Sequence, residues 1–289
     1  SCTVRLNELM SGHTSFKIGG PADILVLPES IEQLREVLKV VKETVVPLTL
    51  LGNGSNVLVR DKGIRGIVIK LGNMLRHFYE AEDLLVFGSG YSLALASYKA
   101  MECGRTGMEF AVGIPGSIGG AVYMNAGAYD GEMQNIVNCV KVMDLQGNER
   151  VLTAEELNFG YRKTSLQNSG LIVTEVTLKM PSGNKDEIKS KMDDFSHRRI
   201  SKQPLEMPSA GSMFKRPPGY FAGTLIDQAG LKGYTVGGAQ ISTKHAGFVV
   251  NVGGATAADV LQLIKDVQTK IKAGVGVELQ PEVLVIGEE

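Results

Sequence analysis

Two glycine-rich stretches are the parts of this sequence best suited to holding a ligand. The first follows an apolar run and reads Leu50-Leu-Gly-Asn-Gly-Ser-Asn56. Glycines let successive backbone N–H groups converge on one anion, and Asn and Ser side chains add neutral donors. Such a nest suits a pyrophosphate. Its candidate cofactor-binding residues are Gly52, Asn53, Gly54, Ser55 and Asn56.

The second stretch runs over residues 113–128 and is also rich in backbone donors and poor in bulky side chains. It reads Gly113-Ile-Pro-Gly-Ser-Ile-Gly-Gly-Ala121, with Asn125-Ala-Gly-Ala128 soon after. Two such stretches could hold a dinucleotide from both sides. The candidate residues here are Gly113, Pro115, Gly116, Ser117, Gly119, Gly120, Asn125 and Gly127.

Neither stretch matches the common nucleotide-binding motifs. The first lacks the lysine of a P-loop, and Gly-x-Gly-x-x-Gly is not found, so the sequence supports neither a nucleoside triphosphatase nor a Rossmann site. Each stretch alone could also be a structural turn. Residue types by themselves do not decide between a cofactor site and turns.

Metal and disulfide chemistry have little support. The cysteines are odd in number and widely spaced, which argues against a disulfide framework or a metal cluster. The histidines show no paired spacing of the kind that binds zinc on a helix. We therefore expect no metal site. The residues concerned are Cys2, Cys103, Cys139, His13, His77, His197 and His245.

The composition fits a chain of two soluble domains. There are 289 residues, 43% of them hydrophobic, and 30 Lys and Arg balance 31 Asp and Glu. No net field therefore draws the chain to nucleic acid or to an anionic membrane. Apolar runs are too short to span a bilayer, and no leader-like segment opens the sequence. We expect a cytoplasmic monomer without nucleic-acid or membrane partners.

The first glycine stretch ends a strand, helix, strand pattern. A strand is expected over residues 22–27 and another over 46–51. Ser30 and Gln33 form a capping box at the start of the helix between them. The glycine stretch thus follows the carboxyl end of the second strand, where α/β sheets tend to hold ligands.

The remaining pattern up to residue 180 mixes strands with one helix. Ser92 caps that helix and Gly104 ends it. A hairpin is predicted around the turn at 146–148. The expected elements are strands 66–70, 84–88 and 171–179, helix 92–103, and hairpin strands 137–143 and 149–153.

Pro181-Ser182-Gly183 interrupts the pattern and predicts a domain boundary. Asn184 and Glu187 cap a charged helix with Ile188, Met192 and Phe195 on one stripe. The fold is therefore predicted as α+β, with domains at 1–180 and 184–289. Expected in the second domain are loop 204–220, helix 221–229, strand 246–250, helix 256–272 and closing strand 283–286.

Several strings of this sequence resemble one known family, the UDP-N-acetylenolpyruvoylglucosamine reductases. Any one of them is weak, but in this order they are specific, and they span about residue 11 to 285. The modest length looks like the shorter (type II) class of the family. The strings are His13-Thr-Ser-Phe-Lys-Ile-Gly-Gly-Pro-Ala22, Leu51-Gly-Asn-Gly-Ser-Asn56, Gly113-Ile-Pro-Gly-Ser-Ile-Gly-Gly120, Tyr161-Arg162, Gly211-Ser-Met-Phe-Lys215, Ala246-Gly-Phe-Val-Val-Asn251 and Pro281-Glu-Val283.

The resemblance implies that residues 1–180 form a two-lobed FAD-binding region of the vanillyl-alcohol-oxidase type, with lobes at about 1–71 and 72–180, followed by an α+β substrate-binding domain. It also implies non-covalent FAD, reduced by NADPH as co-substrate. This fold binds FAD without a Rossmann fingerprint, which explains why that motif is missing. A valine at Gly54 or Gly119 is then expected to block the cofactor and give a folded, largely colourless protein.

The implied reaction reduces the enolpyruvyl group of a UDP-linked amino sugar in cell-wall precursor synthesis. Negative charge that develops beside the substrate carboxylate needs donors, and the carbanion carbon needs a proton. By resemblance Ser212 donates that proton, Arg162 binds the carboxylate, and Glu282 acts with Arg162. Without the resemblance, Ser212 would be read as a loop serine and the other two as surface charges.

The resemblance also suggests that Lys215, Gln240 and Asn251 contact the sugar or its diphosphate. Two other readings stay open. An oxidase of the same flavin fold would pass electrons to oxygen, and a nucleotide-sugar sensor would keep the loops without catalysis. Ser212, Arg162 and Glu282 together argue against the sensor.

Overall fold

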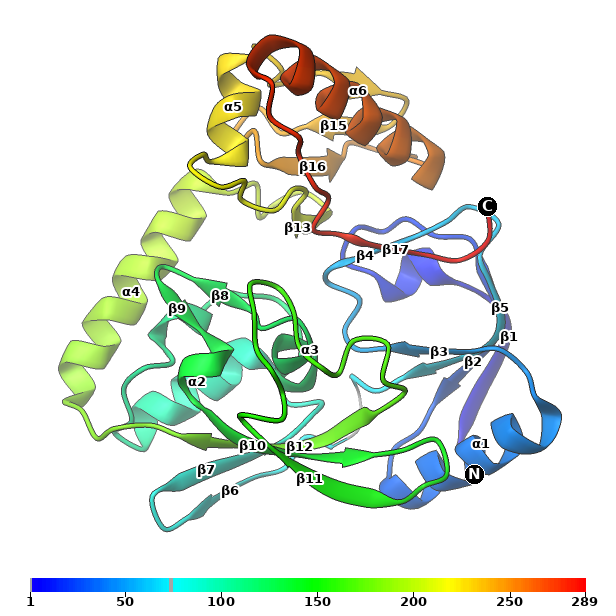
Figure 1. Ribbon diagram of the computed structural model, residues 1–289, viewed down its shortest axis with the longest axis vertical. Coiled ribbons are helices and arrows are strands. Elements are labelled where there is room, and N and C mark those ends of the chain that lie inside the picture. The colour runs from blue at the N-terminus through cyan, green and yellow to red at the C-terminus, as the bar shows by residue number, and fades with distance from the viewer. Residues whose placement is uncertain (1, 73–74) are drawn as a thin grey trace. The chain divides into compact units, whose positions relative to one another are not determined.

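The computed structural model describes residues 2–72 and 75–289 and mixes helices with sheets (Figure 1). This confirms the predicted α+β class. The α-helices are α1 (Ile31–Thr44), α2 (Leu93–Glu102), α3 (Ile118–Tyr123), α4 (Lys185–Lys202), α5 (Ala222–Gln228) and α6 (Ala257–Val275). Short 3-10 helices are Met10–His13, Glu109–Ala111 and Met133–Asn135.

The chain divides into two compact units that interleave along the sequence. Unit 1 holds Leu25–Asn53, Ile67–Arg199 and the first residues up to Arg5. Unit 2 holds Leu6–Ile24, Gly54–Gly66 and Ile200–Glu289. The predicted domains 1–180 and 184–289 are continuous stretches, so they differ from these units and stay a prediction.

The N-terminal sheet has the strand order β1-β2-β5-β3. Its strands are β1 (Thr3–Leu9), β2 (Pro21–Leu27), β5 (Ile64–Lys70) and β3 (Leu48–Leu51). β3 runs parallel to β5, with Leu51 opposite Lys70. Ser30 caps α1 by accepting the Gln33 N–H, as predicted. The sequence did not predict β1, because its side chains are nearly all exposed and show no buried face.

Unit 1 is built on an antiparallel sheet with the order β11-β10-β12-β7-β6. Its strands are β11 (Glu149–Thr153), β10 (Val137–Met143), β12 (Ile172–Lys179), β7 (Leu84–Gly88) and β6 (Phe78–Ala81). The predicted hairpin is confirmed, with Met143 opposite Glu149. Phe87, Val140, Val176 and Leu178 pack with apolar side chains of α2 and α3 to form the core of this unit.

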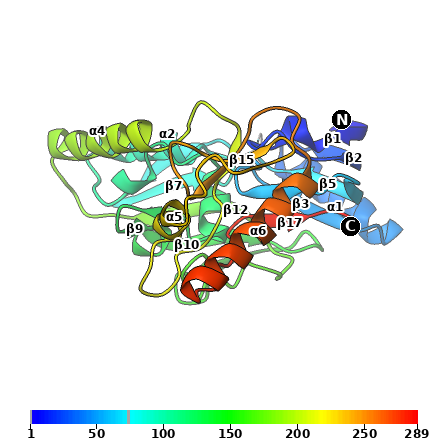
Figure 2. The same cartoon turned by 90° about the horizontal axis from the view of Figure 1, so that it is seen from above.

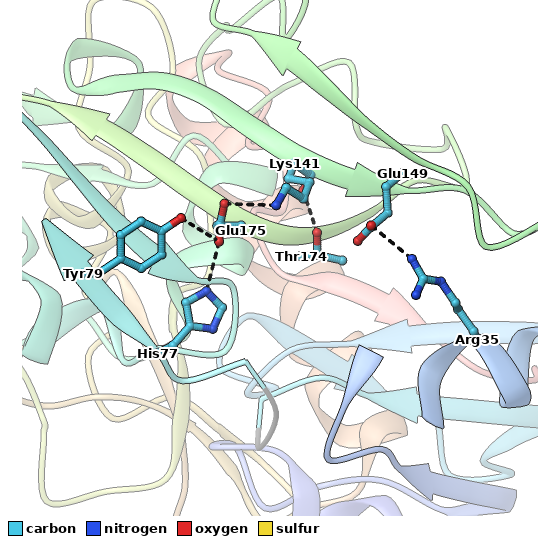
Figure 3. A network of polar contacts seen from close by, with 7 residues as sticks. All are labelled: Arg35, His77, Tyr79, Lys141, Glu149, Thr174 and Glu175. Atoms are coloured by element: carbon cyan, nitrogen blue, oxygen red, sulfur yellow. Dashed lines mark hydrogen bonds and ion pairs between the residues drawn. The ribbon is translucent and has the colours of Figure 1, made fainter. Parts of the chain in front are cut away.

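A polar network lies on this sheet (Figure 3). Glu175 accepts hydrogen bonds from His77 at 3.1 Å and Tyr79 at 3.3 Å, and Lys141 lies 3.5 Å from the same carboxylate. Arg35 on α1 bonds the Glu149 carboxylate at 3.1 Å and so ties α1 to the hairpin. Glu175 is 16% exposed, but its partners and the Arg35–Glu149 pair are about a third or more exposed, so each pair stabilises the fold by at most about 1 kcal/mol.

Unit 2 contains a second antiparallel sheet with the order β13-β16-β15-β14. Helix α6 packs against β14 and β15. Figures 1 and 2 show α6 next to β15. It buries Val260, Leu263, Ile264, Val267 and Ile271 on one face. The strands are β13 (Ser209–Ser212), β16 (Phe248–Asn251), β15 (Ala239–Ile241) and β14 (Thr235–Val236).

Two short strand pairs complete the described structure. The closing strand β17 (Leu284–Ile286) runs parallel to β4 (Val57–Val59), with Leu284 opposite Val57. In unit 1, β8 (Gly127–Ala128) and β9 (Gly131–Glu132) form a tight hairpin. β4 holds the residues that directly follow the first glycine stretch, so β17 helps to position that stretch.

Asp61 stabilises unit 2 by capping α6 from a distant segment. Its carboxylate accepts the N–H groups of Ala257 at 2.7 Å and Ala258 at 2.9 Å. We expect Asp61→Ala to lower the free energy of unfolding by about 1–3 kcal/mol, because two helix donors lose a charged acceptor. Asp83→Ala, which removes an exposed ion pair with Lys179, is the control. Equal changes in urea midpoint for both variants would contradict the capping role.

Candidate active site

Ser212 lies at the end of β13, where the ladder with β16 is irregular. Ser209 lies opposite Val250 and Ser212 opposite Phe248, so three steps on β13 match two on β16. Gly211 takes a φ of +78°, which favours glycine. Such a bulge re-aims the side chain beside it. Ser212 is exposed, while Met213 and Phe214 after it are buried.

The structure corrects the expected loop over residues 204–220, because β13 occupies part of it. The strand has four residues, and Gly211 interrupts its alternation. Periodicity cannot identify so short a strand. The predicted loop residue Ser212 is therefore held by a sheet.

Backbone hydrogen bonds bring Glu282 next to the strand that carries Ser212. The Glu282 N–H donates to the Met213 carbonyl at 2.8 Å. The Lys215 N–H donates to the Gln280 carbonyl at 2.8 Å, so the two segments pair side by side. Three residues predicted from the resemblance, Ser212, Lys215 and Glu282, thus share one neighbourhood in unit 2.

The second half of the first glycine stretch belongs to the same neighbourhood. The Asn56 side chain donates to the Glu282 carbonyl at 3.3 Å, and the Leu284 N–H donates to the Asn56 carbonyl at 3.0 Å. Ser15 links Gly54 to β13: its N–H bonds the Gly54 carbonyl at 3.0 Å and its hydroxyl bonds the Ser209 carbonyl at 2.7 Å. The sequence offered no sign of this role beyond the position of Ser15 in a family string.

Gln240 and Asn251, the other expected substrate contacts, make protein hydrogen bonds in unit 2. Asn251 Oδ1 accepts the N–H groups of Gly253 at 3.0 Å and Ala255 at 3.2 Å, which shapes the turn before α6. Gln240 donates to the Thr235 hydroxyl at 3.0 Å. The Asn251 amide is therefore part of the scaffold of this turn.

Arg162 lies in unit 1 with an unusual backbone, at a φ of +56°. Its guanidinium donates to the carbonyls of Asn125 at 3.3 Å and Gly127 at 3.0 Å. A left-handed backbone at a residue other than glycine is strained and often marks a functional site. Arg162 is thus held by two fixed acceptors.

Asn125 is the hub of this arrangement. Its fully buried amide donates to Glu132 at 3.1 Å and to the Gly160 carbonyl at 3.0 Å, and it accepts the Gln134 N–H at 3.0 Å. The Asn125 side chain, predicted to bind cofactor, is therefore committed to the protein. It fixes the segment that leads to Arg162.

The two glycine stretches meet inside unit 1. A Cβ on Gly52 would lie 3.3 Å from the hydroxyl oxygen of Ser117. Ser117 caps α3, and among residues 2–72 and 75–289 no acceptor is found for the backbone N–H of Gly116 or Ser117. The buried hydroxyl of Ser89 likewise has no partner in this described part. A group rich in acceptor oxygens, such as the pyrophosphate of FAD, fits this donor set.

The structure changes the expectation for valine at Gly54 and Gly119. A Cβ on Gly54 would lie 2.3 Å from the His13 carbonyl oxygen, and one on Gly119 would lie 2.7 Å from Ser89 Cβ. Each valine would first strike the protein itself. Both are therefore expected to disturb folding, so neither isolates the cofactor contact.

Two cations in unit 1 were missed by sequence reasoning. Arg199 is 8% exposed, its side chain packs where a Cβ on Gly113 would lie, and burial lowers its pKa. Lys70 lies opposite Leu51, where the first stretch begins, and burial lowers its pKa as well. The sequence did carry one signal for Arg199. It continues the apolar stripe of α4, and a charged residue at a buried position usually has a partner or a function.

Comparison with known proteins gives one consistent result. The family model for the UDP-N-acetylenolpyruvoylglucosamine reductase C-terminal domain matches residues 203–286, and one for an FAD binding domain matches residues 22–153. The UDP-N-acetylenolpyruvoylglucosamine reductase of Clostridioides difficile (strain 630) is 49% identical over 286 residues, 99% of this chain and 94% of that protein. That of Clostridium perfringens (strain SM101 / Type A) is 51% identical over the same shares.

The chain belongs to the UDP-N-acetylenolpyruvoylglucosamine reductase family. The crystal structure of the reductase from Thermus caldophilus agrees, with a TM-score of 0.83 at 38% identity over 99% of both chains. The predicted resemblance, the oxidoreductase class and the FAD-binding region are thereby confirmed. The individual site residues stay predictions.

The described residues contain neither a membrane-spanning helix nor a metal-binding cluster. No helix within them is long and apolar enough to cross a membrane. No group of three or more His, Cys, Asp or Glu side chains within them could hold a metal ion.

Gly52→Ala tests the FAD site without a clash against backbone. The new methyl group would narrow the space beside Ser117, so we expect FAD affinity to fall about tenfold, or about 1.4 kcal/mol. Gly274→Ala, on α6 with nothing within 4 Å of the added atom, is the control. Fluorescence titration of the apoprotein with FAD measures both. Unchanged affinity in Gly52→Ala would remove this stretch from the site.

Proposed function

We propose that this chain catalyses the FAD-dependent, NADPH-driven reduction of UDP-N-acetylglucosamine enolpyruvate to UDP-N-acetylmuramate in peptidoglycan precursor synthesis. Family membership supports the reaction. The observation that carries the residue assignment is the pairing of the Ser212 strand with the Glu282 segment through the 2.8 Å bond from Glu282 N–H to the Met213 carbonyl.

Each proposed residue answers one need of this reaction. Bound FAD, reduced by NADPH, supplies a hydride to the terminal methylene carbon of the enolpyruvyl group. Negative charge then builds on the adjacent carbon and in the carboxylate. Arg162 binds that carboxylate with its planar fork, and Glu282, as the neutral carboxylic acid, would donate a hydrogen bond to the same charge.

Ser212 completes the reduction by giving its hydroxyl proton to the carbanion carbon. A serine is a weak acid, but the carbanion is strongly basic, so the transfer is favourable. The product has gained one hydride and one proton. Since Ser212 is exposed, solvent can return the lost proton.

Other residues hold the ligands in this proposal. Lys215, beside Glu282, contacts the sugar or its diphosphate, and Gln240 on β15 is a second such contact. Asn251 acts through the turn that its side chain fixes. Arg199 and Lys70 place positive charge near the glycine stretches, which suits the pyrophosphate of FAD.

Anaerobic single turnover tests the proposal. Protein reduced by NADPH is mixed with the enolpyruvyl nucleotide sugar, and flavin absorbance is followed. We expect the oxidised flavin spectrum to return with formation of UDP-N-acetylmuramate. No reoxidation by this substrate, together with reoxidation in a parallel sample exposed to oxygen, would favour the oxidase. No reduction by NADPH would favour the sensor.

A monomeric, cytoplasmic enzyme without nucleic-acid or membrane partners is also part of the proposal. Its support is the near balance of 30 basic and 31 acidic residues. Light scattering of the purified holoenzyme tests the oligomeric state. A mass of twice 31.0 kDa would contradict the monomer.

A further inference from the structure

His245 lies in the turn between β15 and β16 and helps to close it. The Ser242 hydroxyl oxygen accepts the N–H groups of Lys244 at 3.1 Å and His245 at 3.2 Å. His245 Nδ1 then accepts the Gly247 N–H at 3.0 Å. Side chains of the turn thus fix the peptides on both sides of His245.

The Gly247 bond determines the protonation state of the ring. A backbone N–H can only donate, so Nδ1 must present its lone pair and the neutral ring carries its proton on Nε2. A proton on Nδ1 would set two donors against each other. Protonation of His245 and the Gly247 bond therefore exclude one another.

The surroundings of His245 favour the neutral ring. Burial is the main cause that lowers its pKa below 6.5. A hydrogen bond between the ring and the backbone of His245 itself raises the pKa, Lys232 and Lys202 lower it, and Asp227 on α5 raises it, but burial is the largest of these effects. The adjacent Lys244 turns away, with its ammonium on the Ile200 carbonyl at 2.8 Å.

Glycines make room for the ring in this place. A Cβ on Gly223 would lie 3.2 Å from His245 Cε1, and one on Gly247 would lie 3.0 Å from it. On another side the ring meets Phe248 edge-on, with centroids 5.1 Å apart. The His245 ring is therefore packed in a defined position.

This turn is bonded directly to the Ser212 strand. The Gly247 carbonyl accepts the Met213 N–H at 2.8 Å, and Phe248 is the residue opposite Ser212. The His245 carbonyl accepts the Phe248 N–H at 3.0 Å. Gly247 is thus bonded on both sides. Its N–H donates to the His245 ring, and its carbonyl accepts the N–H of Met213, the residue next to Ser212.

We infer that His245 is a positioning residue for Ser212: the neutral ring fixes Gly247, Gly247 fixes Met213 at the bulge, and protonation of the ring releases this hold. The inference rests on the proposed role of Ser212. It assigns His245 no contact with substrate.

Three substitutions at His245 separate the acceptor from the ring. Asn places an oxygen where it can accept the N–H two residues on, as in an Asx turn, but it does not titrate. Ala removes the acceptor, and Gln is too long to accept the same N–H. We expect Ala and Gln to slow flavin reoxidation by substrate about tenfold, the size of one lost neutral hydrogen bond, and Asn to restore most of the rate.

The pH profile supplies a measurement that a merely structural residue would not change. Wild-type reoxidation should fall as pH drops through a pKa below 6.5, because the protonated ring loses the Gly247 bond. His245→Asn should lack this acid limb. His197→Asn, at an exposed histidine of α4, should keep it. Reduction by NADPH and FAD content should be unchanged in all variants.

The outcomes distinguish this inference from the proposed function. Slow Ser212→Ala with an acid limb that persists in His245→Asn would overturn the positioning role alone. Wild-type reoxidation in Ser212→Ala would overturn the role of Ser212 itself. If His245→Ala does not fold, the Asn and Gln pair and the wild-type profile still decide.

Discussion

Ser212→Ala should bind FAD, be reduced by NADPH at the wild-type rate and accept substrate, yet reoxidise its flavin about a hundredfold to ten-thousandfold more slowly. General acids contribute about this much, or roughly 3 to 5 kcal/mol of barrier. A serine that only positioned substrate would contribute one neutral hydrogen bond, about 1 kcal/mol. The size of the loss therefore separates the two roles.

Two further variants serve as a partial rescue and a control for this test. Ser212→Cys keeps a proton donor of lower pKa at the bulge and should recover part of the rate. Ser209→Ala, in the same strand, removes a hydroxyl from the other end of the bulge and should leave the rate unchanged. Single turnovers in water and in deuterium oxide report whether the proton moves in the slow step.

One result would contradict the assignment to Ser212. If Ser212→Ala reoxidises at the wild-type speed, another group must donate the proton. Glu282 would then be the first candidate, because its N–H is bonded to the Met213 carbonyl at 2.8 Å. Glu282→Gln would test it by the same measurement.

Elements with strong local signals could be predicted from the sequence. Ser30 with Gln33 starts α1, where the Ser30 side chain accepts the Gln33 N–H. The hairpin around residues 146–148 needed only alternation and a turn. Helix α3 was missed, because Gly119 and Gly120 favour loops and only packing and the Ser117 cap hold them helical.

The site was less accessible to sequence reasoning, for a physical reason. Ser212 and Glu282 are far apart in the chain, and backbone bonds between β13 and the segment before β17 bring them together. Backbone bonds leave no mark on residue type. Family resemblance named these residues, but it did not show that Asn125 and Asn251 turn their amides toward the protein.

Residue type alone was also a poor guide to polar residues that are buried or half-buried. By residue type, Arg199 and His245 look like surface residues, because most Arg and many His are solvated, and only the position of Arg199 on the apolar stripe of α4 indicated otherwise. Each is instead held where neighbouring glycines leave room for it, Arg199 beside Gly113 and His245 beside Gly223. The positions of the glycines predicted that another group packs closely against the backbone, but they did not predict which side chain that group belongs to.

Arg162→Lys should slow reoxidation by substrate between about tenfold and about a hundredfold, while reduction by NADPH stays near wild type. Charge-assisted hydrogen bonds contribute about 1.5–3 kcal/mol, and lysine keeps the charge but loses the planar fork. A single ammonium cannot bond the Asn125 and Gly127 carbonyls and still present two parallel donors to a carboxylate. The loss should therefore appear only in the half-reaction that involves the carboxylate.

A second variant, at Asn125, tests the same prediction. Asn125→Ala keeps the Arg162 guanidinium group but removes the side-chain amide that holds Gly160 and Gln134, and so loosens the segment that positions Arg162. It should therefore slow the same half-reaction and retain FAD. Arg198→Lys, at an exposed pair with Asp194, is the matched control and should change neither half-reaction. Equal slowing of both half-reactions in Arg162→Lys would indicate a flavin or folding defect, and Arg162 would then not be the carboxylate ligand. Slowing confined to reoxidation in both Arg162→Lys and Asn125→Ala would show that the strained backbone at Arg162 is maintained for substrate.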